Sequence, residues 1–282
     1  TPIDVTWLPD FTNKEWCNGI FSLSEESRIA IFMSYGAVSV IAADIKGTTP
    51  SIEVNVGDEF VIDGLTYVIK ENMTAGVKTV SSEVTECIIP ATIRLGNDNY
   101  TVVSIEEDAF YWSNVTNVTL PETITEIGYG AFRSSPLSSI NLPQQLTSIG
   151  EYAFYKTELS NIIIPDGVTA IEASTFAQCE KLTEITLPTS LQKIGQGAFY
   201  KSNIATIELP ATCLTLGMYA FEKCTSLTSI ALPEGLEEIP MGLLQDCSSL
   251  TEIALPQSVT TIREAAFQNT GSGTATILGG TI

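Results

Sequence analysis

The chain has 282 residues, with 13 Lys and Arg against 33 Asp and Glu and a formal net charge of −20. A protein that binds nucleic acid or an anionic membrane needs clustered basic side chains. The excess of acidic residues therefore argues against both as partners. No run of 18 apolar residues occurs, which excludes an apolar transmembrane helix. The chain starts at Thr1 rather than methionine, so we expect it to begin after a removed leader or inside a longer protein.

Residues 1–50 lack the repeat that fills most of the chain, and we expect them to form a small N-terminal module. Two runs rich in β-branched residues, Arg28–Met33 and Ala37–Ala43, are separated by a short break at a glycine and predict strands. A helix beginning at Ser22 or Ser24, ahead of two glutamates, is the competing interpretation.

Residues 51–86 predict a capping hairpin. Glu59–Ile62 and Leu65–Lys70 flank Asp63-Gly64, and an Asp-Gly pair between two alternating apolar runs is a strong hairpin signal. We expect these strands to cover the open end of the repeat region. An insertion at Arg94–Val103 carries another turn, at Gly96–Asn99, and is expected to project from the cap as a second hairpin.

Residues 87–282 are built from about eight copies of a pattern close to L-x-x-I-x-L-P-x-x-L-x-x-I-G-x-x-A-F, plus a terminal strand. The copies align on prolines that are 22 or 23 residues apart after a longer first step: Pro90, Pro121, Pro143, Pro165, Pro188, Pro210, Pro233 and Pro256. A period of this length is the mark of a solenoid. One rung alone buries too little apolar surface to fold, so stability must come from neighbouring rungs.

Each copy predicts a coil with three sides. The apolar residues three and one positions before the proline share one face of a short strand, and the proline marks the corner to a second strand. The third side closes on a column of large apolar residues: Phe110, Phe132, Phe154, Phe176, Phe199, Phe221, Leu244 and Phe267. At a rung spacing of about 4.8 Å, these rings should stack into a continuous spine.

Five of the six cysteines fall in repeat slots. Cys179, Cys224 and Cys247 lie three residues after the spine residue, where the other copies have Ser or Thr. This slot predicts a small side chain that can bond the backbone of a neighbouring turn. Cys87 and Cys213 fill aliphatic slots. A bridge between Cys224 and Cys247, on adjacent rungs, is left open.

With its L-P, I-G and A-F pairs, the stretch Ile185–Phe199 resembles the BspA-like leucine-rich repeat family, and roughly residues 87–270 share this pattern. The resemblance implies a leucine-rich repeat solenoid, rich in short parallel strands with little helix. It also implies a bacterial protein that is secreted or lies on the cell surface, since some relatives are implicated in adhesion to host matrix proteins or to other cells. The family offers no catalytic residues to carry over. Departures from its pattern are local, as at Leu216, Pro240 and Leu244.

The residue types give no sign of catalysis. Without histidine, Ser-His-Asp and Cys-His arrangements are excluded, and the common zinc sites reduce to Cys-only sets, for which no C-x-x-C pair exists. Neither G-x-G-x-x-G nor a P-loop occurs. We therefore expect no catalytic residues, no metal site and no cofactor. An enzyme with its site in the N-terminal module remains as an alternative.

Two surfaces could contact a partner. On the β face, where leucine-rich repeats usually bind, outward positions before the prolines are small and polar, and the candidates are Asn141, Asn161, Glu184, Glu208 and Glu252. A polar sheet also simply stays soluble. The second surface consists of aromatic residues directly after the spine, two of them followed by lysine: Tyr111, Trp112, Tyr155 and Tyr200. Such residues suit protein or sugar contacts, although covering the spine is the alternative.

The sequence thus predicts a non-enzymatic interaction or adhesion module, extracellular or at the cell surface. Its partner would be a protein or a glycan, with host matrix among the candidates. The alternative is a passive structural spacer of a larger surface protein. A binding module should show one patch of unusual composition on an otherwise uniform coil, whereas a spacer should not. The oligomeric state is not set by the sequence.

Overall fold

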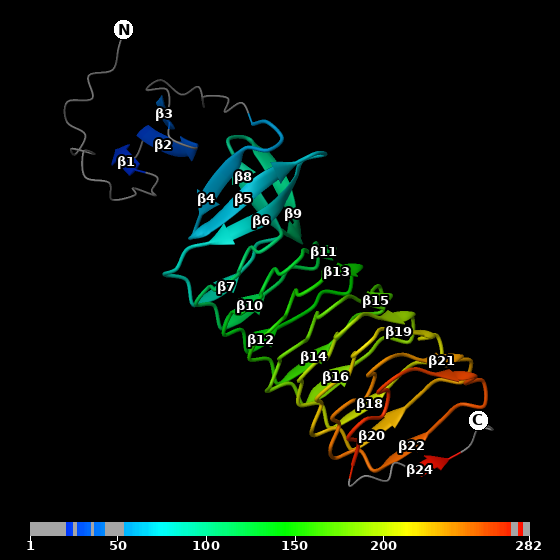
Figure 1. The fold of residues 1–282 in the computed structure, drawn as a ribbon. Coiled ribbons are helices and arrows are strands. Elements are labelled where there is room, and N and C mark those ends of the chain that lie inside the picture. The colour runs from blue at the N-terminus through cyan, green and yellow to red at the C-terminus, as the bar shows by residue number, and fades with distance from the viewer. Residues whose placement is uncertain (1–20, 25–26, 35–36, 43–53, 272–275, 279–282) are drawn as a thin grey trace. The chain divides into compact units, whose positions relative to one another are not determined.

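The computed structural model describes residues 21–24, 27–34, 37–42, 54–271 and 276–278 (Figure 1). The chain divides into two compact units, Thr1–Glu53 and Val54–Ile282. The described residues form strands and turns without a helix, so none of them belongs to a helix that could cross a lipid bilayer.

The described part of the first unit is a small antiparallel sheet. Its strands β1 (Phe21–Ser24), β2 (Ser27–Ser34) and β3 (Ala37–Ala42) follow one another in the order β1-β2-β3. The strands predicted at Arg28–Met33 and Ala37–Ala43 are therefore confirmed as β2 and β3. The alternative of a helix starting at Ser22 or Ser24 is wrong, because β1 pairs with β2 at these positions. Cys17, the one cysteine that does not fall in a repeat slot, lies outside the described residues.

The second unit begins with a cap built from five strands: β4 (Glu59–Ile62), β5 (Leu65–Lys70), β6 (Thr74–Val80), β8 (Thr92–Leu95) and β9 (Asp98–Ile105). β4 and β5 form the expected hairpin, with both turn residues, Asp63 and Gly64, at positive φ. β8 and β9 also form a hairpin, but it does not project. Tyr100 and Val102 on β9 are buried, and β9 pairs with β6 on one side and with β11 of the coil on the other. The expected projection is wrong because the alternating apolar residues of the insertion face the core.

The rest of the unit is a coil of stacked rungs carrying two parallel ladders (Figure 1). The first ladder lies before the prolines: β7 (Glu86–Ile88), β10 (Asn117–Thr119), β12 (Ser139–Ile140), β14 (Asn161–Ile163), β16 (Glu184–Thr186), β18 (Thr206–Glu208), β20 (Ser229–Ala231), β22 (Glu252–Ala254) and β24 (Thr276–Leu278). The second lies after them: β11 (Glu126–Ile127), β13 (Ser148–Ile149), β15 (Ala170–Ile171), β17 (Lys193–Ile194), β19 (Thr215–Leu216), β21 (Glu238–Ile239) and β23 (Thr261–Ile262). Most neighbouring strands pair in register, with breaks between β12 and β14, β16 and β18, β13 and β15, and β19 and β21, and this stacking confirms the predicted solenoid.

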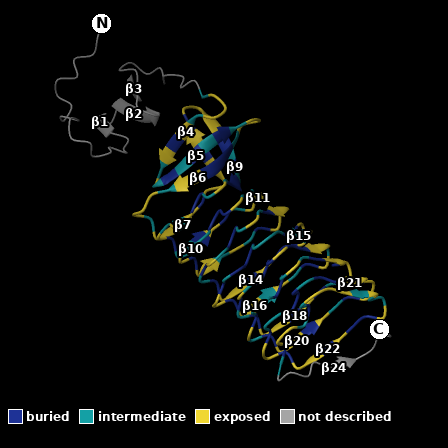
Figure 2. Cartoon of the chain, in the orientation of Figure 1, coloured by how far each residue is buried: buried dark blue, intermediate teal, exposed yellow. Residues whose placement is uncertain are grey.

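The predicted spine is present. Successive rings from Phe110 to Phe221 lie 4.9 to 5.7 Å apart between centroids, with planes within 20° of one another. All of these rings are fully buried, and Leu244 continues the column. Figure 2 shows this buried interior running along the coil between exposed outer positions. The spine therefore carries the rung-to-rung packing that a single repeat lacks.

Close rung contact explains the I-G pair of the repeat. A Cβ atom added to Gly150 would lie 2.6 Å from the backbone nitrogen of Tyr129 on the preceding rung. The equivalent glycines approach the preceding backbone in the same way: Gly128, Gly195 and Gly217. Glycine fills this slot in four rungs and allows this close approach, whereas the other four rungs carry Glu106, Glu172, Pro240 and Arg263 at the same slot.

The Ser, Thr and Cys slot bonds the backbone of the spine. The Ser135 hydroxyl donates to the carbonyl of Phe132 in its own rung at 2.7 Å, whereas the Cys224 thiol donates to the carbonyl of Phe199 in the preceding rung at 3.0 Å. Cys224 and Cys247 are both free thiols, so they are not bridged. Burial raises the pKa of Cys224 to about 12.

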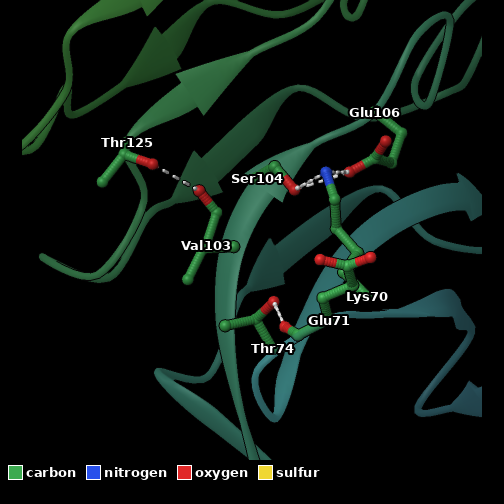
Figure 3. A network of polar contacts seen from close by, with 7 residues as sticks. All are labelled: Lys70, Glu71, Thr74, Val103, Ser104, Glu106 and Thr125. Atoms are coloured by element: carbon green, nitrogen blue, oxygen red, sulfur yellow. Dashed lines mark hydrogen bonds and ion pairs between the residues drawn. The ribbon is translucent and has the colours of Figure 1, made fainter. Parts of the chain in front are cut away.

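A polar network joins the cap to the first rung (Figure 3). Lys70 on β5 donates to Ser104 on β9 at 3.1 Å and pairs with Glu106 at 2.8 Å. Ser104 in turn donates to the same Glu106 oxygen at 2.5 Å. Gly76 on β6 makes room for these groups, because an added Cβ would lie 1.9 Å from Glu106 Oε1. The network therefore depends on a glycine in the middle of a strand.

Candidate interaction surfaces

The third side of the coil is shaped by residues with left-handed backbone. In each of eight rungs, the residues two before and two after the spine position have positive φ: Asp108, Trp112, Gly130, Ser134, Tyr152, Lys156, Ser174, Gln178, Gly197, Lys201, Tyr219, Lys223, Gly242, Asp246, Ala265 and Asn269. In all of these rungs but the last, their amides donate to carbonyls of the next rung, as Tyr152 does to Ala173 at 3.0 Å. Two tight turns per rung thus place four slots around the spine, which lie three and two residues before it and one and two residues after it.

Trp112 is the largest side chain at these left-handed positions. Its φ is 53°, a conformation that costs a non-glycine residue roughly 1 kcal/mol or more. It is also 75 % exposed, so packing does not offset that cost. A large exposed ring on a strained backbone favours a role outside the fold.

Trp112 belongs to a contiguous set on the first three rungs that we call the aromatic cluster: Tyr111, Trp112, Tyr129, Arg133, Tyr152 and Tyr155. Ring centroids lie 6.2 Å apart for Tyr111 and Trp112, 5.5 Å for Tyr129 and Tyr152, and 5.7 Å for Tyr152 and Tyr155. Tyr111 and Tyr129 are each more than a third exposed. The cluster therefore offers several ring faces and edges at one place on the coil.

Arg133 links Tyr111 on the first rung to Tyr129 in the aromatic cluster. Its guanidinium carbon lies 4.3 Å from the centroid of the Tyr111 ring and 5.8 Å from that of Tyr129, within the range of cation-π attraction. One terminal nitrogen approaches the Asp108 carboxylate at 3.4 Å. The guanidinium therefore contacts both rings and the carboxylate, although Arg133 Nε and Asp108 Oδ1 are buried without a hydrogen-bond partner.

A second group of aromatic and basic residues lies on the fifth and sixth rungs. The amines of Lys201 and Lys223 each lie 5.5 Å from the centroid of Tyr200. Lys223 also pairs with Glu222 at 3.0 Å, and this hydrogen bond is the main reason that its pKa is raised. Tyr200 is half-buried while Lys201 is exposed.

The β-face candidates are exposed but do not converge. Glu184 on β16 and Glu252 on β22 share one outward column three rungs apart, whereas Glu208 on β18 lies in the other outward column. The Asn141 side chain is already engaged, because its amide accepts from Leu120 N at 2.8 Å and donates to Leu120 O at 2.9 Å. That asparagine extends the ladder rather than facing a partner.

The remaining β-face candidate, Asn161 on β14, is exposed, and its amide donates to the Ser160 hydroxyl at 3.1 Å. Local bonds of this kind hold the side chain along the strand. The β face is therefore a set of separate polar groups without an aromatic or arginine anchor, which hot spots favour.

Sequence reasoning found Tyr111, Trp112 and Tyr155 but missed the other members of the aromatic cluster: Tyr129, Arg133 and Tyr152. Arg133 occupies the same slot as Tyr111 and Tyr155 one rung away, while the two tyrosines come from the slots before the spine. Comparing all four third-side slots along the repeat, rather than only those after the spine, would have found them.

Within the described residues, no three Cys, Asp or Glu side chains lie close enough to hold a metal ion. Burial raises the pKa of the repeat thiols, to about 11 for Cys179 and Cys213, which keeps them protonated and unreactive.

The fold and its surfaces define a leucine-rich repeat solenoid. The family described as BspA type leucine-rich repeat region, six copies, matches residues 86–163, 103–224 and 147–274. The chain therefore belongs to the BspA-type leucine-rich repeat family, and its repeat scaffold is that of this family. No curated protein matches the chain.

Solved structures of bacterial leucine-rich repeat proteins are similar to it. A leucine-rich repeat protein from Bacteroides ovatus is 31% identical with a TM-score of 0.56, over 74% of this chain and 50% of that one. The chain thus spans half the length of this relative. A leucine-rich cell surface protein from Faecalibacterium prausnitzii is 20% identical with a TM-score of 0.49, over 75% and 86% of the two chains. The leucine-rich repeat protein of T. pallidum is 25% identical with a TM-score of 0.49, over 73% and 86%.

Proposed function

We propose that the protein is a non-enzymatic interaction module, secreted or on the cell surface, that binds a protein or glycan partner through the aromatic cluster. The observation that carries this proposal is Trp112, which is 75 % exposed at a left-handed backbone position and adjoins Tyr111 and Arg133. Aromatic residues and arginine are the side chains that dominate binding energy at protein interfaces.

A passive spacer accounts less well for this composition. On the fourth rung, the same four slots hold Ala173, Ser174, Ala177 and Gln178, which complete the coil without any large ring. The scaffold therefore does not require the aromatic cluster. The aromatic and arginine side chains of the cluster favour binding here rather than on the β face, because the β face offers only separate carboxylates and amides.

A catalytic function would need a site in the first unit, whose described residues are the strands β1 to β3. Nothing favours such a site over binding, so the proposal stays with an interaction module.

The test is a binding screen of the whole chain against immobilised host matrix proteins and glycans, with matched surface variants. For any ligand found, Tyr111→Ala combined with Trp112→Ala should weaken binding about 30-fold, the effect of losing a hot spot worth about 2 kcal/mol. Glu184→Gln combined with Glu208→Gln on the β face serves as the control and should leave affinity unchanged. Loss of binding only in the β-face variant would contradict this location. If the screen finds no ligand, that result would favour the spacer.

A further inference from the structure

The fourth rung forms a gap in the aromatic and basic side chains of the third side. Directly after the spine, the third and fifth rungs carry Tyr155-Lys156 and Tyr200-Lys201, while the fourth carries Ala177-Gln178. Ala177 is 1 % exposed, so no side chain rises there between the two tyrosines. We call these six residues the Tyr-Lys site.

The backbone holds the two Tyr-Lys pairs in a fixed relation. The Lys156 amide donates to the Ala177 carbonyl at 2.9 Å, and the Gln178 amide donates to the Tyr200 carbonyl at 2.6 Å. Each tyrosine is therefore one rung from Ala177, and the two are roughly 10 Å apart by the spacing of parallel strands. Both lysines have the same left-handed backbone, with φ of 56°.

The charges at this place differ from those of the rest of the coil. The other cations of the rungs are paired with carboxylates: Arg133 with Asp108, Lys181 with Glu158, Lys193 with Glu172, Lys223 with Glu222 and Arg263 with Glu238. Among the described cations on the rungs of the coil, Lys156 and Lys201 have no carboxylate partner, and outside the rungs Arg94 on β8 of the cap has none either. On a chain of net charge −20, two unpaired cations on one column make a local site for negative charge.

We propose that the Tyr-Lys site binds an acidic polysaccharide, with a sugar ring over Ala177 between Tyr155 and Tyr200 and its carboxylates at Lys156 and Lys201. Sugar rings present C–H faces that pack on tyrosine, and Gln178 adds an amide that can bond a hydroxyl. An acidic peptide would use the two lysines but would place no apolar surface on the rings. This site shares Tyr155 with the aromatic cluster but does not include Trp112, and it goes beyond the proposed function because it specifies a carboxylated glycan and the lysines that bind it.

The test measures binding of the whole chain to three carboxylated glycans, oligogalacturonate, hyaluronate and alginate, by calorimetry at low salt. Fully methyl-esterified oligogalacturonate has the same rings without the charge, and a polyglutamate peptide has the charge without the rings. At least one carboxylated glycan should bind, and both comparison ligands should bind at least tenfold more weakly. Affinity should fall as salt is added, because exposed ion contacts are screened.

Two pairs of variants assign the site. Lys156→Gln with Lys201→Gln should weaken glycan binding about tenfold, while Lys181→Gln with Lys193→Gln removes the same charge elsewhere and should change affinity less than twofold. Ala177→Tyr should fill the gap and abolish binding without changing charge. The repeat accepts tyrosine at this slot, as at Tyr155, and Gln268→Tyr in the last rung is its control.

The proposal is overturned if none of the three glycans binds at millimolar concentration, if polyglutamate binds as tightly as the glycans, or if Ala177→Tyr has no effect. It is also overturned if the two lysine pairs have equal effects. Each of these results leaves the aromatic cluster untouched, since Tyr111→Ala with Trp112→Ala tests that surface separately. Conversely, loss of the Trp112-dependent ligand does not affect the Tyr-Lys site.

Discussion

At the residue scale, the conflict between backbone and side chain at Trp112 is the clearest sign of function. The left-handed turn would be satisfied by glycine, as at Gly130, Gly197 and Gly242 in the other column of turns. Lysine, serine and glutamine fill the Trp112 column on neighbouring rungs. These comparisons show that the fold needs the turn and not the indole.

The substitution Trp112→Gly separates folding from binding. Glycine relieves the left-handed strain but adds freedom to the unfolded chain, and the two effects are of similar size. We expect the free energy of unfolding in urea to change by less than about 1 kcal/mol. Phe132→Ala, which removes a fully buried spine ring, should instead cost about 3–5 kcal/mol. A loss of that size for Trp112→Gly would mean that the indole serves the fold.

The buried thiols give the stability a defined pH dependence. Folding raises the pKa of Cys224 from 9.0 to about 12 and that of Cys179 to about 11, in both cases mainly through burial. Their contribution is full below pH 9 and is lost as pH rises toward the folded-state pKa, because the unfolded thiols release protons first. The free energy of unfolding should therefore fall between pH 9 and 11.

The control for this prediction is Cys179→Ser with Cys224→Ser, which other rungs make acceptable because serine occupies the same slot at Ser135 and Ser202. The double variant should show a shallower decline over this range in urea titrations at several pH values. Identical slopes would show that the thiols are not protected in the folded protein.

At the element scale, the cap is held to the coil by β9, which pairs with both β6 and β11. Gly76 lies on β6 beneath the Lys70, Ser104 and Glu106 network. Gly76→Ala should displace Glu106 and cost about 1–3 kcal/mol, the range for leaving a polar group unsatisfied. Hydrogen exchange should speed up in β6 and β9 while β18 stays protected.

The double variant Gly76→Ala with Glu106→Ala is the control, because it removes the side chain nearest to the new methyl group and leaves only the Ser104 hydroxyl close to it. We expect it to be no less stable than Gly76→Ala alone, a non-additive result typical of groups in contact. Additive losses would place the damage elsewhere in β6.

The elements also show how much of the fold can be predicted from the sequence. The prolines and the spine predict both ladders, since a period of 22 or 23 residues fixes the rungs and alternation fixes the buried faces. The position of β9 could not be predicted in this way. Its pairing partners are distant in sequence, and the same alternating residues suit a projecting hairpin or a central strand.

The candidate surfaces could likewise be predicted only in part from the sequence. Tyr111, Trp112, Tyr155 and Tyr200 were visible from their place after the spine, but a single slot does not reveal which rings meet across rungs. The contact of Tyr129 with Tyr152 depends on tight turns with left-handed residues. The sequence also does not reveal that the Asn141 side chain bonds the Leu120 backbone on the preceding rung.

At the scale of the whole molecule, the coil is a uniform support with local differences on one side. The rungs share a spine and two ladders, while their third-side slots change from the aromatic cluster, through the small residues of the fourth rung, to Tyr200 and Lys201. The support sets the spacing between surfaces, and the slots set their chemistry.

The aromatic cluster is tested most directly through the fluorescence of Trp112. The chain has two other tryptophans, Trp7 and Trp16, so the variant Trp7→Phe with Trp16→Phe carries Trp112 as its single indole. Free in solution, this residue should be readily quenched by acrylamide, in line with its 75 % exposure. On addition of a ligand from the binding screen, the account predicts a blue shift and a several-fold loss of quenching. Unchanged emission and quenching with saturating ligand would contradict it.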